Sequence, residues 1–141
     1  MDELTHAIYN SFDNNQNPPN ILDLDRSFLE YWEIREFLSK LSKNKWQDIV
    51  ELDSFFSISK DAEIWTGYMP PEWFPYYLPA FLLITHKHHE SFFKNLRGYL
   101  IGYLELDKYS NNRCQLIYYL LQNVLSDEQK KTIKIYLDLY R

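Results

Sequence analysis

The sequence has one cysteine, three glycines and no long hydrophobic run, and each shortage excludes a class of protein. Cys114 cannot form a disulfide within the chain, which excludes the disulfide-stapled scaffolds of small secreted proteins. The opening Met1-Asp2-Glu3-Leu4 lacks the basic start and apolar run of a secretory signal. No stretch approaches the roughly 18 consecutive apolar residues that span a bilayer. We therefore expect a cytoplasmic protein without membrane-spanning segments.

Motifs of catalysis are also missing. With so few glycines the chain holds no P-loop, no G-x-G-x-x-G and no G-x-S-x-G, the patterns that cradle phosphate or present a nucleophilic serine. Cys114 falls on an apolar helical stripe, where a neutral buried thiol is expected rather than a reactive thiolate. The acidic side chains on helix faces are typical of a solvated surface. We predict a protein that is not an enzyme and needs no cofactor.

Aromatic side chains are abundant. Tyrosine, phenylalanine and tryptophan number 12, 9 and 4 in 141 residues, so rings must fill much of the core. Hydrophobic residues make up 45% and charged residues 25%, which are ordinary values for a globular domain. The length suits one domain, and we predict that residues 1–141 form it.

Apolar residues recur at intervals of three and four in several segments, which predicts helices. The helical segments are 2–12, a helix of about four turns from Ser27 to Leu41, a shorter piece from Trp46, then 92–104, 114–125 and 126–140. The segment 114–125 repeats most regularly, so we expect it to be central. Residues 55–68 are rich in Phe, Ile and Trp and favour a short extended pair or irregular coil.

The passage 69–83 holds four prolines within ten residues. Pro71 suits the first position of a helix, and the spacing of Pro75 and Pro79 predicts a helical turn, a bend and a second helix start at Pro79. The nearby rings could form a ligand groove or a corner that fills the core, and the corner is favoured. These rings are Trp73, Tyr76 and Tyr77. The predicted fold is all-α, an irregular single-domain bundle of about five to seven helices with a proline-rich bend near residues 69–80.

Residues 71–82 read Pro-Glu-Trp-Phe-Pro-Tyr-Tyr-Leu-Pro-Ala-Phe-Leu. This run resembles the motif F-L-T-P-E-x-F-x-Y-Y-L-P-A-[YF]-L of an uncharacterised bacterial family. Trp46 upstream and the Asp127-Glu128-Gln129 step are similar to features of that family as well, so the resemblance covers about residues 25–140. The chain departs from the motif at 68–70 and at Pro75. The family has no established activity, so the resemblance implies a bacterial domain and no catalytic residues.

The run His86-Lys87-His88-His89-Glu90 is the candidate metal site. On a helix, His86 would face His89 and Glu90 at spacings of three and four. Neither H-E-x-x-H nor paired cysteines accompany it, and a solvated turn is the more common structure for such a run. We predict no metal ligands, and metal binding by His86, His88 and His89 stays open.

Charge is unevenly distributed along the chain. Residues 1–80 hold 14 acidic and 6 basic residues, whereas 81–141 hold 6 acidic and 9 basic residues, for a net charge of −5. A nucleic-acid partner would require a basic stripe, which the chain lacks, so we predict no nucleic-acid binding. The acidic first half either serves solubility or docks a basic partner, and both interpretations stay open.

The function hypothesis is a small protein-binding protein of bacterial origin that occludes its partner's surface, such as an immunity protein that neutralises a basic toxin or effector. The alternative is a small metal- or ligand-binding enzyme-like domain, and a third hypothesis is an accessory subunit that self-associates through residues 92–106. The oligomeric state stays open. The predicted partner-binding residues are Glu30, Glu33, Glu36, Asp48, Glu51 and Asp53 for steering, and Tyr31, Trp46 and Trp65 as aromatic anchors.

Overall fold

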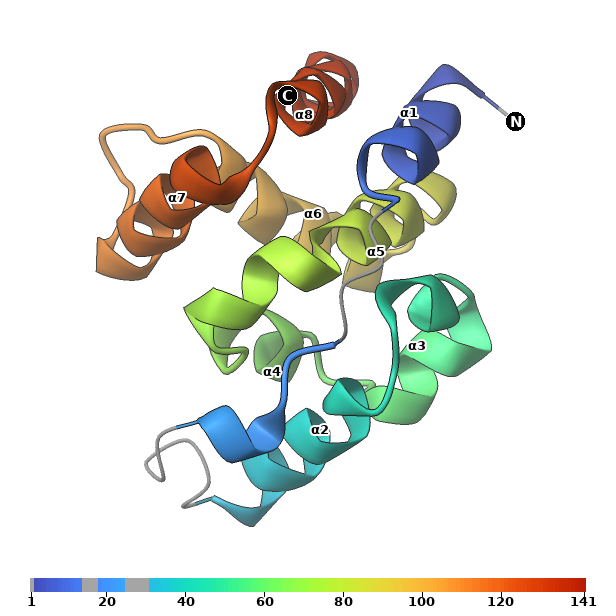
Figure 1. Ribbon diagram of the computed structural model, residues 1–141, viewed down its shortest axis with the longest axis vertical. Helices are drawn as coiled ribbons and strands as arrows, with labels where there is room; N and C mark the ends of the chain where they lie inside the picture. The colour runs from blue at the N-terminus through green and yellow to red at the C-terminus, as the bar shows by residue number, and fades with distance from the viewer. Residues whose placement is uncertain (1, 14–17, 25–30) are drawn as a thin grey trace.

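A computed structural model describes residues 2–13, 18–24 and 31–141, and these residues form helices and connections without a strand (Figure 1). The α-helices are α1 (Glu3–Ser11), α2 (Trp32–Ser42), α3 (Leu52–Ile58), α4 (Ala62–Gly67), α5 (Phe74–Lys87), α6 (Ser91–Leu104), α7 (Asn112–Val124) and α8 (Asp127–Tyr140), and the 3-10 helices are η1 (Ile21–Asp23), η3 (Trp46–Ile49) and η4 (Pro71–Trp73). The all-α class is confirmed. The described residues contain eight α-helices, more than the five to seven predicted.

Helix α5 lies at the centre of the fold. It contacts α1, α6, α7, η3 and η4, and every residue from Tyr76 to Thr85 is buried (Figure 1). No charged residue occurs between Trp73 and Thr85, which suits a helix that is covered on all sides. The prediction that residues 114–125 are central is wrong. Only Ile117 and Leu121 of α7 are buried, because its apolar residues are spread around the helix rather than gathered on one inward face.

The predicted bend and second helix start at Pro79 are also wrong. Pro75 lies in the first turn of α5, where a missing N–H costs little, but Pro79 lies inside the continuous helix. An interior proline costs about 3 kcal/mol, since it cannot donate to the carbonyl four residues earlier. Burial of a large apolar side chain contributes about 1.5–3 kcal/mol, and Leu78, Phe81 and Leu82 are all buried on this helix. Packing therefore outweighs the proline penalty.

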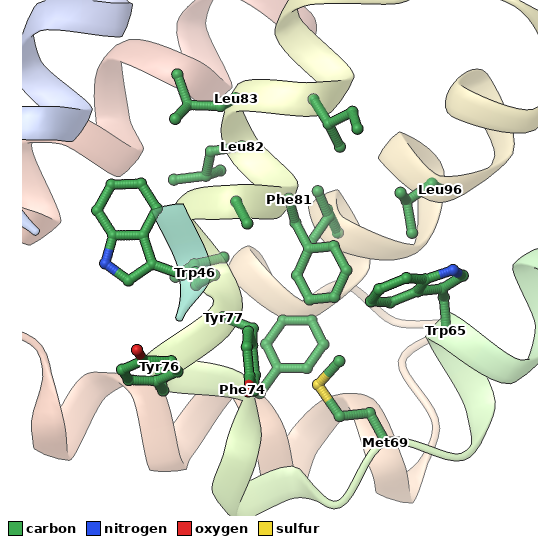
Figure 2. Packing of buried hydrophobic residues seen from close by; sticks show 14 of the residues in the cluster. Trp46, Trp65, Met69, Phe74, Tyr76, Tyr77, Phe81, Leu82, Leu83 and Leu96 are labelled. Carbon is green, nitrogen blue, oxygen red and sulfur yellow. The ribbon is translucent and has the colours of Figure 1, made fainter. Parts of the chain in front are cut away.

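Aromatic rings fill the core around α5. The Trp65 ring stacks on Phe55 with centroids 4.0 Å apart and meets the Phe81 ring edge-on at 5.7 Å. Figure 2 shows Trp46 and Trp65 on opposite sides of α5. The rings of the proline-rich passage are buried as well, which confirms the core corner rather than a groove. Their exposed fractions are 3% for Trp73, 9% for Tyr76 and 0% for Tyr77.

Residues 55–58 and 62–67 are helical, which corrects the prediction of an extended pair or irregular coil over residues 55–68. Phe55 and Ile58 lie one turn apart on α3 and are both buried. Helix α4 begins at a genuine cap, since the Asp61 carboxylate accepts a hydrogen bond from the Glu63 amide. Clusters of Phe, Ile and Trp are typical of strands, but here burial against the core selects the helix.

The first and last predicted helices, residues 2–12 and 126–140, are confirmed as α1 and α8. Asp2 caps α1, and Ser126 and Gln129 form a capping box before α8, so both helices begin within one residue of their predicted starts. Helices α1 and α8 pack side by side (Figure 1).

For the helix predicted from Ser27, residues 25–30 lie outside the described part. Within the described part α2 begins at Trp32, after an extended Tyr31, so the helix is shorter than predicted.

Tyr77 fixes the end of α2 from inside the core. Its hydroxyl donates to the Leu41 carbonyl at 2.8 Å, which also accepts from the Asn44 amide, and lies 3.0 Å from the Asn44 carbonyl just beyond the helix. Burial raises the pKa of Tyr77, which keeps the hydroxyl protonated as a donor.

We expect Tyr77→Phe to lower the free energy of unfolding by about 0.5–1.5 kcal/mol, because it removes the hydroxyl that donates to the Leu41 carbonyl. Tyr99→Phe is the matched control, since Tyr99 is 53% exposed. Denaturant unfolding of both variants measures the difference. Equal stability of the two variants would contradict this role of Tyr77.

Candidate functional site

A groove of about 520 Å³ lies between α2 and α4. We call it the acidic groove, because among the residues that the structure describes its only charged lining residues are carboxylates. Its lining residues are Tyr31, Glu33, Ile34, Asp61, Glu63, Ile64 and Tyr68. The three acidic side chains are exposed, and the two isoleucines are half-buried. The groove thus combines an apolar floor with an acidic rim.

The carboxylates of the acidic groove are not neutralised within the described part of the chain. No lysine or arginine there forms an ion pair with Glu33, Asp61 or Glu63. Among the described residues, the hydrogen bond that the Asp61 carboxylate accepts comes from the Glu63 amide in the first turn of α4. Carboxylates gathered in this way repel one another and create a negative potential that attracts cations.

Two tyrosines stand beside these carboxylates. Tyr31 is 67% exposed and Tyr68 is 44% exposed, so both rings present surface to a partner. An arginine or lysine can pair with a carboxylate while its charge lies over a tyrosine face. Arginine suits this combination best, because its planar guanidinium stacks on rings and bonds carboxylates through two parallel N–H groups. The arrangement can bind cations but offers no reacting group of its own.

Polar side chains from the core hold both walls of the groove. Tyr77 fixes the C-terminal end of α2, as described above. Arg113 fixes the C-terminal end of α4, donating to the Thr66 carbonyl at 3.0 Å and to the Met69 carbonyl at 2.8 Å. The Tyr103 hydroxyl donates to the same Thr66 carbonyl at 2.7 Å. Since cations and donors at a helix C-terminus satisfy its free carbonyls, these bonds keep α4 in position.

A second hollow, of about 650 Å³, lies on the other side of α4. Glu63 lines both hollows, and the second is completed by residues of α6. Its lining includes Lys94, so its charge is mixed rather than acidic. Glu63 therefore lies on the boundary between the two hollows.

The structure brings only part of the predicted site into the acidic groove. Tyr31 and Glu33 line it. Glu36 follows one turn later on α2 and pairs with Lys40 at 3.1 Å. The other predicted acids lie outside the groove on exposed positions of η3 and α3 and just before α3. These are Asp48, Glu51 and Asp53, of which Asp48 accepts from the Lys45 amide and Glu51 lies 3.8 Å from the Lys87 ammonium.

Two predicted anchors are corrected by the structure. Trp46 is 1% exposed and Trp65 is 0% exposed, so neither can contact a partner on the surface. Both rings carry more apolar area than any other side chain type, and this area is used to cover α5. Trp65 also donates its ring N–H to the Ser59 carbonyl at 2.9 Å. Glu30 lies outside the described residues.

Sequence reasoning missed Asp61, Glu63 and Tyr68. The signal was present, because Asp61-Ala62-Glu63 has the acidic cap and acidic first turn of a helix start. Treating residues 55–68 as extended structure hid it, since in that geometry the two carboxylates would not share a rim with Glu33.

The histidines of the candidate metal site are not grouped together in the described part of the chain. Helix α5 ends at Lys87 and His88 is extended, so the helical spacing from His86 to His89 does not apply. The His86 ring lies between Asp2 and Tyr140, with Nε2 3.0 Å from the Asp2 carboxylate. His89 accepts from Arg97 at 2.7 Å. In the described part of the chain, no three His, Cys, Asp or Glu residues are grouped as metal ligands.

The His86 contacts link three helices. Because the Asp2 carboxylate can only accept, Nε2 of His86 donates to it, and Nδ1 of the same ring is hydrogen-bonded to the Tyr140 hydroxyl. The bonds from the Thr5 amide and His86 lower the pKa of Asp2 to about 2. This network fastens α1 to α5 and α8.

Comparison of the chain with protein-family models, with curated proteins and with solved structures finds no match. Among the helices of the described residues, none has the length and apolar character needed to cross a membrane. The site must therefore be interpreted from its own geometry.

We expect Asp2→Asn, which keeps a capping acceptor but removes the charge, to destabilise the protein at neutral pH. The pKa of Asp2 is lowered from 3.8 to about 2, so its ionised form favours the folded state above the unfolded value, and this contribution disappears as the pH falls from about 4 through about 2. Denaturant unfolding at a series of pH values measures it, with Asp13→Asn as the control. A stability difference that stays constant over this window would contradict the linkage.

Proposed function

We propose that this chain is a binding protein that occludes a basic surface of a partner protein through the acidic groove, and that its specific role is that of an immunity protein which neutralises a basic toxin. One observation carries the proposal: Glu33, Asp61 and Glu63 form a concave rim between two exposed tyrosines, without a cationic partner among the described residues. Such a rim is complementary to arginine and lysine side chains.

Magnitudes indicate how the groove would bind. An exposed ion pair contributes only about 0.2–1 kcal/mol, so three carboxylates alone give weak attraction. Tyrosine and arginine dominate interface energies when they are desolvated together. The rings of Tyr31 and Tyr68 would cover the partner's cations, and the half-buried isoleucines would receive their aliphatic stems. Affinity then depends on rings and carboxylates acting together.

The remaining acids of the first half would act at longer range. Glu36, Asp48, Glu51 and Asp53 are outside the groove, and two of them already lie near lysines of the same chain. Their contribution would be to the association rate, which rises when a negative field attracts a positive partner and falls when salt screens it.

The alternative of a metal- or ligand-binding enzyme-like domain has less support. His86 and His89 bond to Asp2, Tyr140 and Arg97 rather than to an open site. The other proposed pocket, between Trp73 and Tyr77, is filled by buried rings.

We expect the double variant Glu33→Gln with Glu63→Gln to bind a nine-residue arginine peptide about tenfold more weakly than the wild-type protein, or about 0.7 kcal/mol for each carboxylate removed. The matched control is Glu90→Gln with Glu128→Gln, which changes the net charge equally at exposed positions outside the groove. Calorimetry measures the affinities, and amide chemical shifts should move on α2 and α4.

Equal weakening by the two double variants would show attraction by net charge alone and would contradict cation binding in the acidic groove.

The immunity role has a separate readout with the same variants. When the product of the gene directly upstream is expressed in bacteria, its growth arrest should be relieved by the wild-type chain and by the control, but not by the groove variant. A non-toxic metabolic enzyme at that position would contradict the immunity role and leave cation binding intact.

A further inference from the structure

Two segments of thirteen residues lack any charged side chain, and only one of them is explained by the fold. Residues 73–85 cover most of α5, which the rest of the chain buries. Residues 114–126 cover most of α7, which has only two buried residues. An exposed helix of a protein with 25% charged residues normally carries charge on its solvent side. The sequence of α7 is thus that of a helix covered on both sides.

The solvent side of α7 is apolar and amide-rich. We call it the α7 face, and it consists of the exposed residues Asn112, Gln115, Leu116, Tyr119 and Asn123. Leu116 is 58% exposed and Tyr119 is 57% exposed. The single charged residue of the helix, Arg113, turns inward to the Thr66 and Met69 carbonyls and adds no charge to this face.

Apolar surface continues around the α7 face. Val124 at the end of the helix is 52% exposed, and Tyr109 just before it is 81% exposed. Beside the helix, α6, α7 and α8 line a hollow of about 190 Å³ with five aliphatic side chains and with Gln122, Lys130 and Lys134. The aliphatic residues are Leu104, Leu121, Leu125, Ile133 and Leu137. Exposed apolar side chains gathered on one helix, as on α7, are typical of an interaction site.

We propose that the α7 face is a homodimer interface, covered by the α7 face of a second copy. The absence of charged side chains on the α7 face limits which partner can cover it. A partner on an uncharged face must itself be uncharged there, or it would bury charges without counter-charges. The chain carries a net charge of −5, so two copies repel over most orientations, whereas the α7 face presents no charged side chain to its copy.

The α7 face is also complementary to itself, as a two-fold contact requires. Asn112, Gln115 and Asn123 carry side-chain amides, which both donate and accept, so each can pair with the same group of another copy. Leu116 and Tyr119 provide the apolar centre. Thirteen residues extend about 20 Å, a small interface, so we expect self-association at micromolar rather than nanomolar concentrations.

Sedimentation velocity of the full chain between about 1 and 200 μM tests the proposal. We expect a concentration-dependent monomer–dimer equilibrium for the wild-type protein. The variant Leu116→Lys with Tyr119→Lys places like charges across the contact and should weaken the dimer at least about tenfold. Lysine favours helix, so circular dichroism should show the same helix content. The control is Leu139→Lys on α8, also an exposed apolar position, which should leave the dimer constant unchanged.

A wild-type protein that is monomeric at every concentration overturns the proposal, and the α7 face then belongs to a different protein. A dimer that the α7 variant does not weaken also overturns it. Equal weakening by Leu139→Lys would show that general charge rather than this face controls association. The interface is independent of cation binding, so the acidic-groove variants should dimerise as the wild-type protein does.

Discussion

Ten consecutive residues of α5, from Tyr76 to Thr85, lie inside the molecule, and a helix buried on every side requires neighbours on every side. These neighbours are the helices α1, α6 and α7 and the 3-10 helices η3 and η4. This requirement explains the ring-rich composition, because Trp46 and Trp65 each cover a large area of one side (Figure 2). It also explains why polar side chains reach carbonyl groups from within the core, as Tyr77 does at the end of α2.

The burial of α5 determines where the charged residues of the surrounding helices lie. Once the inner faces are committed to the core, the acids of α2 and α4 are left together on one rim, where Arg113 and Tyr77 hold the two helices in place. The side of α7 away from the core keeps amides and apolar groups instead. The protein thus presents two surfaces of different chemistry. We propose that the acidic groove binds cationic side chains of a partner and that the α7 face contacts a second copy of the chain.

Periodicity and capping residues predicted the elements that local chemistry controls. The residues Asp2, Ser126 and Gln129 marked helix starts correctly, and residues 92–104 formed the expected helix. Errors arose where tertiary contacts decide. Pro79 stays inside a helix because burial outweighs its penalty, and Phe55 joins a helix because Trp65 stacks on it. Of the site, Tyr31 and Glu33 were predicted as an aromatic anchor and an acidic residue of the first half, whereas the burial of Trp46 and the position of Glu63 depend on helices distant in sequence.

Amide hydrogen exchange along the chain tests most directly whether the fold depends on α5. If α5 is the central helix that its neighbours cover on every side, its amides should exchange only through global unfolding, and their opening free energy should equal the free energy of unfolding from denaturant titration. Helices α2 and α7, at the periphery, should open at lower free energy. Exchange of the α5 amides at a lower free energy than those of α6 or α8 would contradict the account.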